Sequence, residues 1–261
     1  MNASLNLANE RRSPVAPLTA VLEISRITLR QLMGRRRTLL LLLLSALPIL
    51  LAFAFRASDT LSVERFTRTS FNGITVTILM PLVAILFGAG AFGAEIDDGT
   101  IVYLLAKPLG RVWIVLAKAL TAAAMAALLT GISTGIAAFI VLGSVEGGTK
   151  VVEAQVFGAV VGSICYAVLF LTVSLFTRRA LVIGIGYMLI WEGALSSLLS
   201  GIANFSIRQY ALGAADFVTK LPIETARLAP ETGIALAAAL VVICLALATW
   251  KLMRFELPGG D

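Results

Sequence analysis

Residues 93–118, "GAEIDDGTIVYLLAKPLGRVWIVLAK", decide the topology of this chain because they lie between two long uncharged runs. Acidic side chains precede a short apolar segment here, and basic side chains follow it. The order is Glu95, Asp97 and Asp98, then Thr100 and Ile101–Ala106, then Lys107, Arg111 and Lys118. Apolar side chains exposed to water between charges are unfavourable, so this segment needs a surface to cover it.

The amino-acid composition indicates whether water or lipid surrounds the chain. Hydrophobic residues make up 59% of the 261 residues and charged residues 14%, against about 45–50% and about 25% in soluble domains. Lipid must therefore surround much of the chain. The sequence has no histidine, which argues against zinc hydrolases and histidine-dependent nucleophiles. Cys165 and Cys244 lie inside apolar runs, where we expect small hydrophobic residues and no disulfide framework.

Apolar runs of about 20 residues, enough to cross a bilayer as a helix, occur six times. Their hydrophobicity is uniform and does not alternate, which favours helices over a membrane barrel. The sequence therefore predicts an all-α polytopic membrane protein with a transmembrane domain over 38–261. Glycine spacing in three runs predicts close helix contacts within the chain first, and a dimer face second. The expected spans cover about 38–55, 71–94, 115–142, 154–177, 180–203 and 233–250.

Lysine and arginine collect at the cytoplasmic edges of membranes, and their distribution orients these spans. With the N-terminus inside, fourteen of the 21 basic residues fall on the inner side and seven on the outer side. The count predicts that both termini and residues 93–118 are cytoplasmic. It also accounts for the formal charge of +6 without nucleic acid, for which the sequence shows no binding pattern.

The residues ahead of the first span divide into a tail and a helix. Residues 1–17 are polar with two prolines, so we expect a mobile cytoplasmic tail. Residues 18–37 predict an amphipathic helix on the inner membrane surface. This helix either anchors the chain in lipid or contacts a partner protein, and both interpretations remain open. Its apolar residues are Leu18, Val21, Leu22, Leu29, Leu32 and Met33, beside a polar strip of Thr19, Glu23, Arg26 and Arg30.

The first cytoplasmic loop is predicted to hold a very short helix. Gly99 ends the preceding helix, Thr100 can cap a new one with its hydroxyl, and Pro108 prevents its continuation. Fewer than two helical turns are unstable in water on their own, so lipid or a protein groove must cover Ile101–Leu105. The acids in front and the bases behind suit the helix dipole and favour one fixed orientation.

This loop carries a family resemblance. The segment "EIDDGTIVYLLAKPLGR", residues 95–111, followed by Lys118, resembles the first cytoplasmic loop of ABC-2-type transporter permeases. Those are membrane subunits of ATP-driven exporters, and they include nitrous-oxide-maturation, multidrug and bacteriocin-immunity branches. The resemblance extends to the six spans, the N-terminal surface helix and "YMLIWEGALSSLLSGIANFSIRQY", residues 187–210. The loop of that family carries a coupling helix that docks in a cleft of the ATPase. The matching positions here are Glu95, Asp97, Gly99, Thr100, Tyr103, Leu104, Leu105, Lys107, Pro108 and Arg111.

The resemblance implies a non-catalytic permease subunit, which forms the substrate pathway and couples ATP hydrolysis on another chain to export. The sequence contains no G-x-x-x-x-G-K-[ST] phosphate loop. We therefore expect ATP and Mg²⁺ on the partner ATPase, and no metal or cofactor on this chain. The implied assembly has two ATPase subunits and a second permease copy or a homologous permease, in a bacterial-type inner membrane.

Glu192 is an ionisable residue within a predicted span, about 18 Å from the inner end of 180–203 at roughly 1.5 Å per residue. A carboxylate facing lipid at that depth is costly. Glu192, with Trp191 beside it, therefore either contacts substrate or holds helices together, within the chain or at a dimer interface. The segment that follows, 204–231, can form interfacial helices, dip into the outer leaflet or remain a surface loop.

Two other function classes compete with the permease. An ion-coupled secondary transporter usually carries more intramembrane ionisable residues and inverted repeats, whereas this sequence shows chiefly Glu192 and no evident repeat. An intramembrane enzyme is disfavoured because the sequence lacks histidine, paired intramembrane aspartates and an evident nucleophile constellation.

Overall fold

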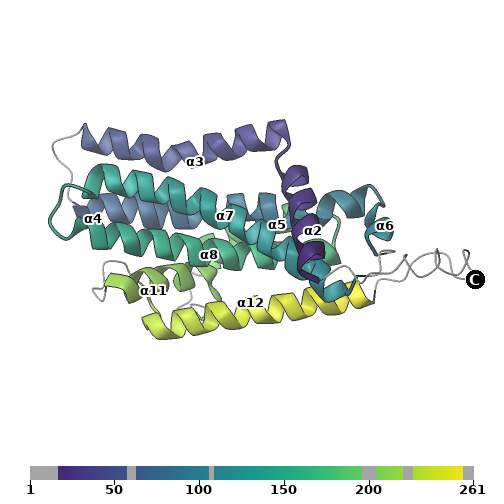
Figure 1. The fold of residues 1–261 in the computed structure, drawn as a ribbon. Coiled ribbons are helices and arrows are strands. Elements are labelled where there is room, and N and C mark those ends of the chain that lie inside the picture. The colour runs from purple at the N-terminus through teal and green to yellow at the C-terminus, as the bar shows by residue number, and fades with distance from the viewer. Residues whose placement is uncertain (1–16, 58–62, 106–108, 196–203, 220–225, 255–261) are drawn as a thin grey trace, which may run out of the picture.

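The fold is a bundle of long helices, seen in a computed structural model that describes residues 17–57, 63–105, 109–195, 204–219 and 226–254 (Figure 1). These residues contain helices and turns but no strand, which confirms the all-α prediction. The elements are α2 (Pro17–Leu32), α3 (Arg35–Arg56), α4 (Val63–Phe66), the π-helix η1 (Thr67–Leu79), α5 (Met80–Asp97), α6 (Ile101–Leu105), α7 (Arg111–Leu142), α8 (Gly148–Phe176), α9 (Ala180–Gly186), the π-helix η2 (Tyr187–Leu195), α11 (Ile207–Thr219) and α12 (Pro230–Met253).

Five helical stretches in the described residues are long and apolar enough to cross a membrane: Arg37–Arg56, Glu64–Asp97, Arg111–Leu142, Gly148–Phe176 and Pro230–Met253. The prediction of six long spans therefore differs from the structure at 180–203. There the chain forms a shorter apolar helix, Ala180–Gly193, and residues 196–203 lie outside the described part. The second, third and fourth helices begin earlier than the apolar runs alone indicated, because polar and charged residues extend their first turns.

Helix α8 occupies the centre of the bundle and packs against α5, α7, α11 and α12. Small and hydroxyl residues on α8 permit this close packing. A Cβ atom placed on Gly158 would lie 2.5 Å from the carbonyl oxygen of Ala211 on α11, so only glycine fits there. Thr130 on α7 and Ser163 on α8 share a hydrogen bond of 2.6 Å between their hydroxyls. Small residues and interhelical hydrogen bonds are the means by which helices associate in lipid.

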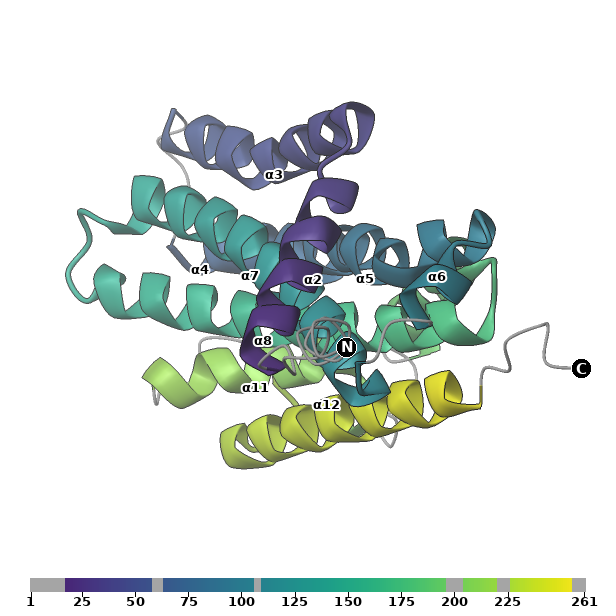
Figure 2. The same cartoon turned by 45° about the vertical axis from the view of Figure 1, so that its right-hand side comes forward.

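The bundle has two distinct ends. Helices α2 and α6 and the C-terminal end of α12 lie together at one of them, which we call the α6 end (Figures 1 and 2). Helix α4 and the turn between α7 and α8 lie at the other, which we call the α4 end (Figure 1). Helices α3, α5, α7 and α8 alternate in direction between the two ends, and α12 runs in the same direction as α8 (Figure 1). The described parts of the segments that the basic-residue count assigned to the inner side of a membrane therefore share one end of the molecule.

The segment after η2 forms a helix that belongs to the bundle core. In α11 the side chains of residues 207 and 209–216 are buried, and the helix packs against α8 and α12. Of the conformations left open for 204–231, the structure therefore shows a packed helix over 207–219.

The close approach of α5 and α8 gives a first prediction. A Cβ on Gly88 of α5 would collide with the backbone carbonyl of Ala167 on α8, whereas a Cβ on Gly93 of the same helix meets nothing within 4 Å. Because a backbone atom cannot turn aside, we expect Gly88→Ala to lower the free energy of unfolding by about 1–3 kcal/mol. Gly93→Ala, the matched control, should leave it unchanged or slightly raised. Thermal unfolding in detergent tests this, and equal midpoints for the two variants would contradict the packing.

Candidate functional site

The candidate site lies at the α6 end, where a tight turn joins α5 to α6. Gly99 adopts a left-handed conformation with φ of 68°, which glycine accepts without steric cost. Its N–H donates to the Ile96 carbonyl at 3.4 Å, so α5 ends where the sequence indicated. Helix α6 follows, with the Tyr103 N–H donating to the Thr100 carbonyl at 3.0 Å.

Helix α6 has one covered side chain and one strongly exposed side chain. Ile101 is buried in the core of the bundle and Val102 is half-buried against it. Tyr103 is 76% exposed. The expectation that an outside surface must cover all of Ile101–Leu105 is therefore wrong for Ile101, which the chain covers itself. Among the described side chains of α6, Tyr103 is the one strongly exposed and available to a partner.

The acidic residues before α6 separate into two groups. Asp97, Asp98 and Thr100 are exposed and remain available to a partner, as does the backbone at Gly99. Glu95 is only 8% exposed and points into the bundle. The sequence placed Glu95 on the docking surface. In the structure its carboxylate instead turns inward, because a buried lysine attracts it.

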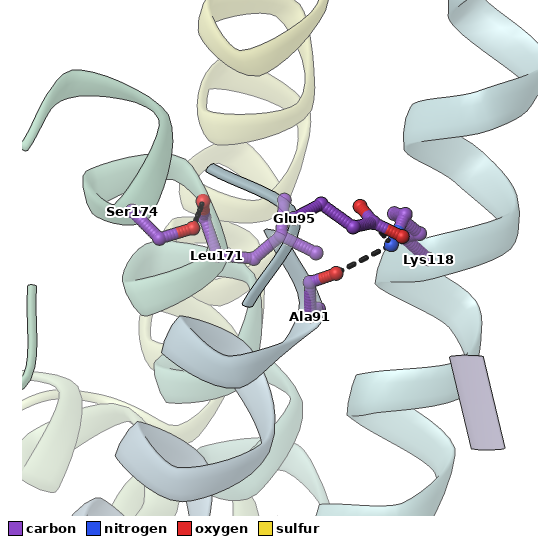
Figure 3. A network of polar contacts seen from close by, with 5 residues as sticks. All are labelled: Ala91, Glu95, Lys118, Leu171 and Ser174. Carbon is purple, nitrogen blue, oxygen red and sulfur yellow. Dashed lines mark hydrogen bonds and ion pairs between the residues drawn. The ribbon is translucent and has the colours of Figure 1, made fainter. Parts of the chain in front are cut away.

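That lysine is Lys118 of α7. Its ammonium lies 2.7 Å from Oε2 of Glu95 and donates to the Ala91 carbonyl at 2.5 Å (Figure 3). It also lies 4.8 Å from the ring centre of Phe92. Lys118 is 1% exposed. Its ammonium group is therefore shielded from water, and these contacts must replace its hydration. The ion pair fixes the last turn of α5, the turn that leads into α6, to the long helix α7.

Sequence reasoning noted Lys118 without assigning it this role. A usable signal existed: a single lysine inside an otherwise uncharged apolar run, 115–142, requires a countercharge from a neighbouring helix. Glu95, Asp97 and Asp98 are the acids at the same end of the bundle, and of these the structure buries Glu95. The pairing of antiparallel helices α5 and α7 places the two residues opposite one another.

Arg111 stabilises a different helix from the one the sequence suggested. We expected it to complement the C-terminal end of α6. Instead its Nη1 donates to the carbonyls of Leu252 and Met253 at 2.8 and 2.5 Å. Those are the carbonyls that a helix end leaves without partners, and a cation is favourable there. Arg111 therefore ties the start of α7 to the end of α12. Lys107 and Pro108 lie outside the described residues, as do the side chains of Leu104 and Leu105.

Helix α2 crosses the bundle beside α6 (Figure 2). It packs on α7 and α5 through Ile24, Thr28 and Leu32, which are buried at four-residue spacing. The predicted apolar face contained Leu32 but missed Ile24 and Thr28, and two of its members, Leu22 and Met33, are exposed. The helical spacing of the buried face was missed because one of its residues is a polar threonine.

The exposed strip on α2 contains Glu23, Arg26 and Arg30. Its contact with lipid or with a partner protein stays a prediction.

Glu192 lies in η2 and is 2% exposed. Its carboxylate accepts hydrogen bonds from the Ile207 N–H at 2.9 Å, the Ser206 hydroxyl at 2.6 Å and the Tyr187 hydroxyl at 3.2 Å. Ile207 begins α11, so Glu192 caps the positive end of that helix from another segment of the chain. Trp191 donates its indole N–H to the Phe205 carbonyl at 3.3 Å. Both residues hold η2 to the start of α11, which favours the structural role over substrate contact.

With this geometry established, comparison with known families is decisive. The family described as ABC-2 family transporter protein matches residues 34–191, more than half of the chain. The protein belongs to the ABC-2 transporter family. The matched region runs from the start of α3 to Trp191 and contains α5, α6 and Lys118. No curated protein sequence matches the chain.

The buried ion pair of this ABC-2 permease gives a second prediction. Lys118→Met leaves the Glu95 carboxylate buried without its countercharge, and breaking such a pair lowers stability by roughly 3–5 kcal/mol. Replacing both residues, Glu95→Leu with Lys118→Met, should recover most of that loss because two apolar side chains can pack together. Lys150→Met, at an exposed position of α8, is the control. Thermal unfolding in detergent measures all three, and a double variant no more stable than Lys118→Met would contradict the pairing.

The cap on α11 gives a third prediction. Glu192→Gln keeps one oxygen, which can accept from the Ile207 N–H and the Tyr187 hydroxyl, and its amide NH2 can donate to the Ser206 hydroxyl oxygen, so we expect a loss of no more than about 1 kcal/mol. Glu192→Leu leaves several buried donors without an acceptor, each costing about 1–3 kcal/mol. The melting temperatures of both variants test this, with a transport assay alongside. If Gln were as damaging as Leu in both measurements, charge rather than hydrogen bonding would be the essential property.

Proposed function

We propose that this ABC-2 permease couples ATP hydrolysis on a separate ATPase subunit to export of a substrate across the membrane. The supporting observation is the placement of α6: a short helix at one end of the bundle, with Tyr103 76% exposed. It directly follows the end of α5, which a buried ion pair joins to α7. A displacement applied to α6 by a partner would reach those two long helices directly.

The proposed partner is a pair of ABC ATPase subunits, which would carry ATP and Mg²⁺. Exposed groups around α6 offer a mixed surface suited to a protein cleft, with Tyr103 at its centre and Asp97, Asp98 and Thr100 beside it. Helix α2, with its exposed Glu23, Arg26 and Arg30, lies at the same end and can contribute a second contact. We propose that two permease subunits, either two copies or one copy and a homologue, complete the assembly.

We place the α6 end in the cytoplasm of a bacterial-type cell. Fourteen of the 21 lysines and arginines belong to segments assigned to this side, in accord with the positive-inside distribution. Both termini are then cytoplasmic. Export as the direction of transport follows from the family resemblance of the loop.

Ion-coupled transport receives less support from the same structure. Its proton or ion relays need ionisable groups that change partners within the membrane. In the described residues, the deeply buried acid and base of the long helices, Glu95 and Lys118, neutralise one another. Glu192 is occupied by the cap on α11. A driving force supplied by ATP on another chain fits this arrangement better.

Co-purification of the permease with the proposed ABC ATPase subunit, co-expressed with it, gives a fourth prediction. Tyr103→Asp places a charge on the exposed face of α6 and should weaken ATPase retention at least about tenfold, equivalent to roughly 1.4 kcal/mol. Tyr103→Phe should retain the ATPase. Val145→Asp, in the exposed turn between α7 and α8 at the α4 end, is the control for a new surface charge. Stoichiometric ATPase with Tyr103→Asp would show that α6 is not the docking element.

A further inference from the structure

A cavity of about 280 Å³ lies at the α6 end between α3, α5, α8 and α9, on a different part of the surface from Tyr103. Its polar lining residues are Arg37, Asp97, Ser174, Thr177 and Arg178. Two cations and one anion thus face a single small space. This is an unusual concentration of charge at the first turn of a membrane-crossing helix.

Arg37 is held in this cavity by the shape of α5. A Cβ atom on Gly90 would lie 2.5 Å from Nη1 of Arg37, so the glycine makes room for the guanidinium against the helix. Burial of the arginine is partial, and Arg178 reaches the cavity from the turn after α8. Neither arginine forms an ion pair with another of the described residues. Ser174 already donates its hydroxyl to the Leu171 carbonyl at 2.7 Å (Figure 3).

The cavity continues into an apolar groove of about 360 Å³ along the membrane-spanning part of the bundle. The two share Ile85, Leu86 and Leu181. Beyond these, only aliphatic side chains line the groove, among them Leu40 and Leu47 of α3. The seven-residue separation of these two leucines corresponds to about 10 Å along the helix axis. The groove therefore runs along the bundle, away from the two arginines.

We propose that the cavity and groove together bind one anionic glycerophospholipid from the leaflet at the α6 end. Its phosphate lies between Arg37 and Arg178, and one acyl chain lies along the groove. Guanidinium groups are well suited to phosphate oxygens. The charges support a monoanionic headgroup, because two arginines, one Asp97 and one phosphate sum to zero. This assignment uses neither Tyr103 nor the exposed strip of α2, and it shares only Asp97 with the proposed ATPase-docking surface.

Native mass spectrometry of the detergent-solubilised permease tests the headgroup site. The probes are phosphatidylglycerol, phosphatidylcholine and inorganic phosphate, each added separately and in competition. We expect one tightly held phosphatidylglycerol on the wild type. The double variant Arg37→Gln/Arg178→Gln should bind it on the order of tenfold more weakly, since it loses charge-assisted contacts to phosphate. Arg179→Gln removes one positive charge from the position next to Arg178, which is exposed and does not line the cavity, and should bind as the wild type does.

The groove is tested separately on helix α9. Ile185→Trp fills the groove that Ile185 lines, whereas Ile183→Trp adds the same ring to a residue of α9 outside the lining. We expect loss of lipid with the first and retention with the second, both variants having wild-type melting temperatures.

Three results would overturn the proposal. Equal lipid retention by the double arginine variant and the wild type would remove the headgroup site. Displacement of phosphatidylglycerol by millimolar inorganic phosphate would mean that a free anion, and no lipid chain, is recognised. If Ile185→Trp altered the oligomeric mass and left lipid binding intact, the groove would be a contact for a second copy of the chain.

Discussion

A buried lysine cannot remain charged in hydrocarbon without a countercharge, and this constraint shapes the α6 end of the protein. Lys118 satisfies it with Glu95 and with the carbonyl of Ala91, both on α5. The pair therefore does more than bring two helices together. It fixes the rotation of the last turn of α5, and that rotation decides which residue of α6 turns toward the core and which turns outward. Ile101 is covered and Tyr103 is exposed as a consequence.

Other polar contacts extend this fixed region across the same end. Arg111 joins the start of α7 to the end of α12, and the Ser25 hydroxyl of α2 donates to the Ala117 carbonyl of α7 at 3.4 Å. Helix α7 is common to all of these contacts. Because α7 is 32 residues long, it reaches the opposite end of the bundle as one element. The turn that leads into α6 is thus connected to the opposite end of the bundle through α7, and the proposed coupling to an ATPase would use this connection.

The part of the bundle around the start of α11 is held by different contacts. Glu192 of η2 caps α11, and Arg208 of α11 donates to the side-chain oxygen of Asn72 in η1 at 2.5 Å. Both π-helical stretches of the described residues, η1 and η2, take part in this network, and wide helical turns of that kind occur frequently at functional sites. The two networks are therefore different in kind. A buried ion pair anchors the α6 end, and hydrogen bonds around irregular helices hold the start of α11.

The sequence predicted most of the architecture because hydrophobic length and charge distribution are local properties. Five of the expected spans correspond to long helices, and Gly99 ends α5 as its conformational freedom suggested. The errors concern properties that depend on partners far away in sequence. The lone Lys118 in its apolar run indicated that a countercharge was needed, but nothing near Glu95 indicated that this residue would supply it. Nothing near Arg111 indicated the end of α12. Ile24 and Thr28 were missed because helical spacing gives a face, while only the neighbouring helix decides which face is buried.

The central claim is that the α5–α7 ion pair presents Tyr103 to an ATPase. Replacing Tyr103 with the photoreactive amino acid p-benzoylphenylalanine, in membranes that contain the assembled transporter, tests it most directly. We predict an adduct with the ATPase subunit from position 103 and none from the same substitution at Val145. An adduct with lipid alone, or equal ATPase adducts from both positions, would contradict the account.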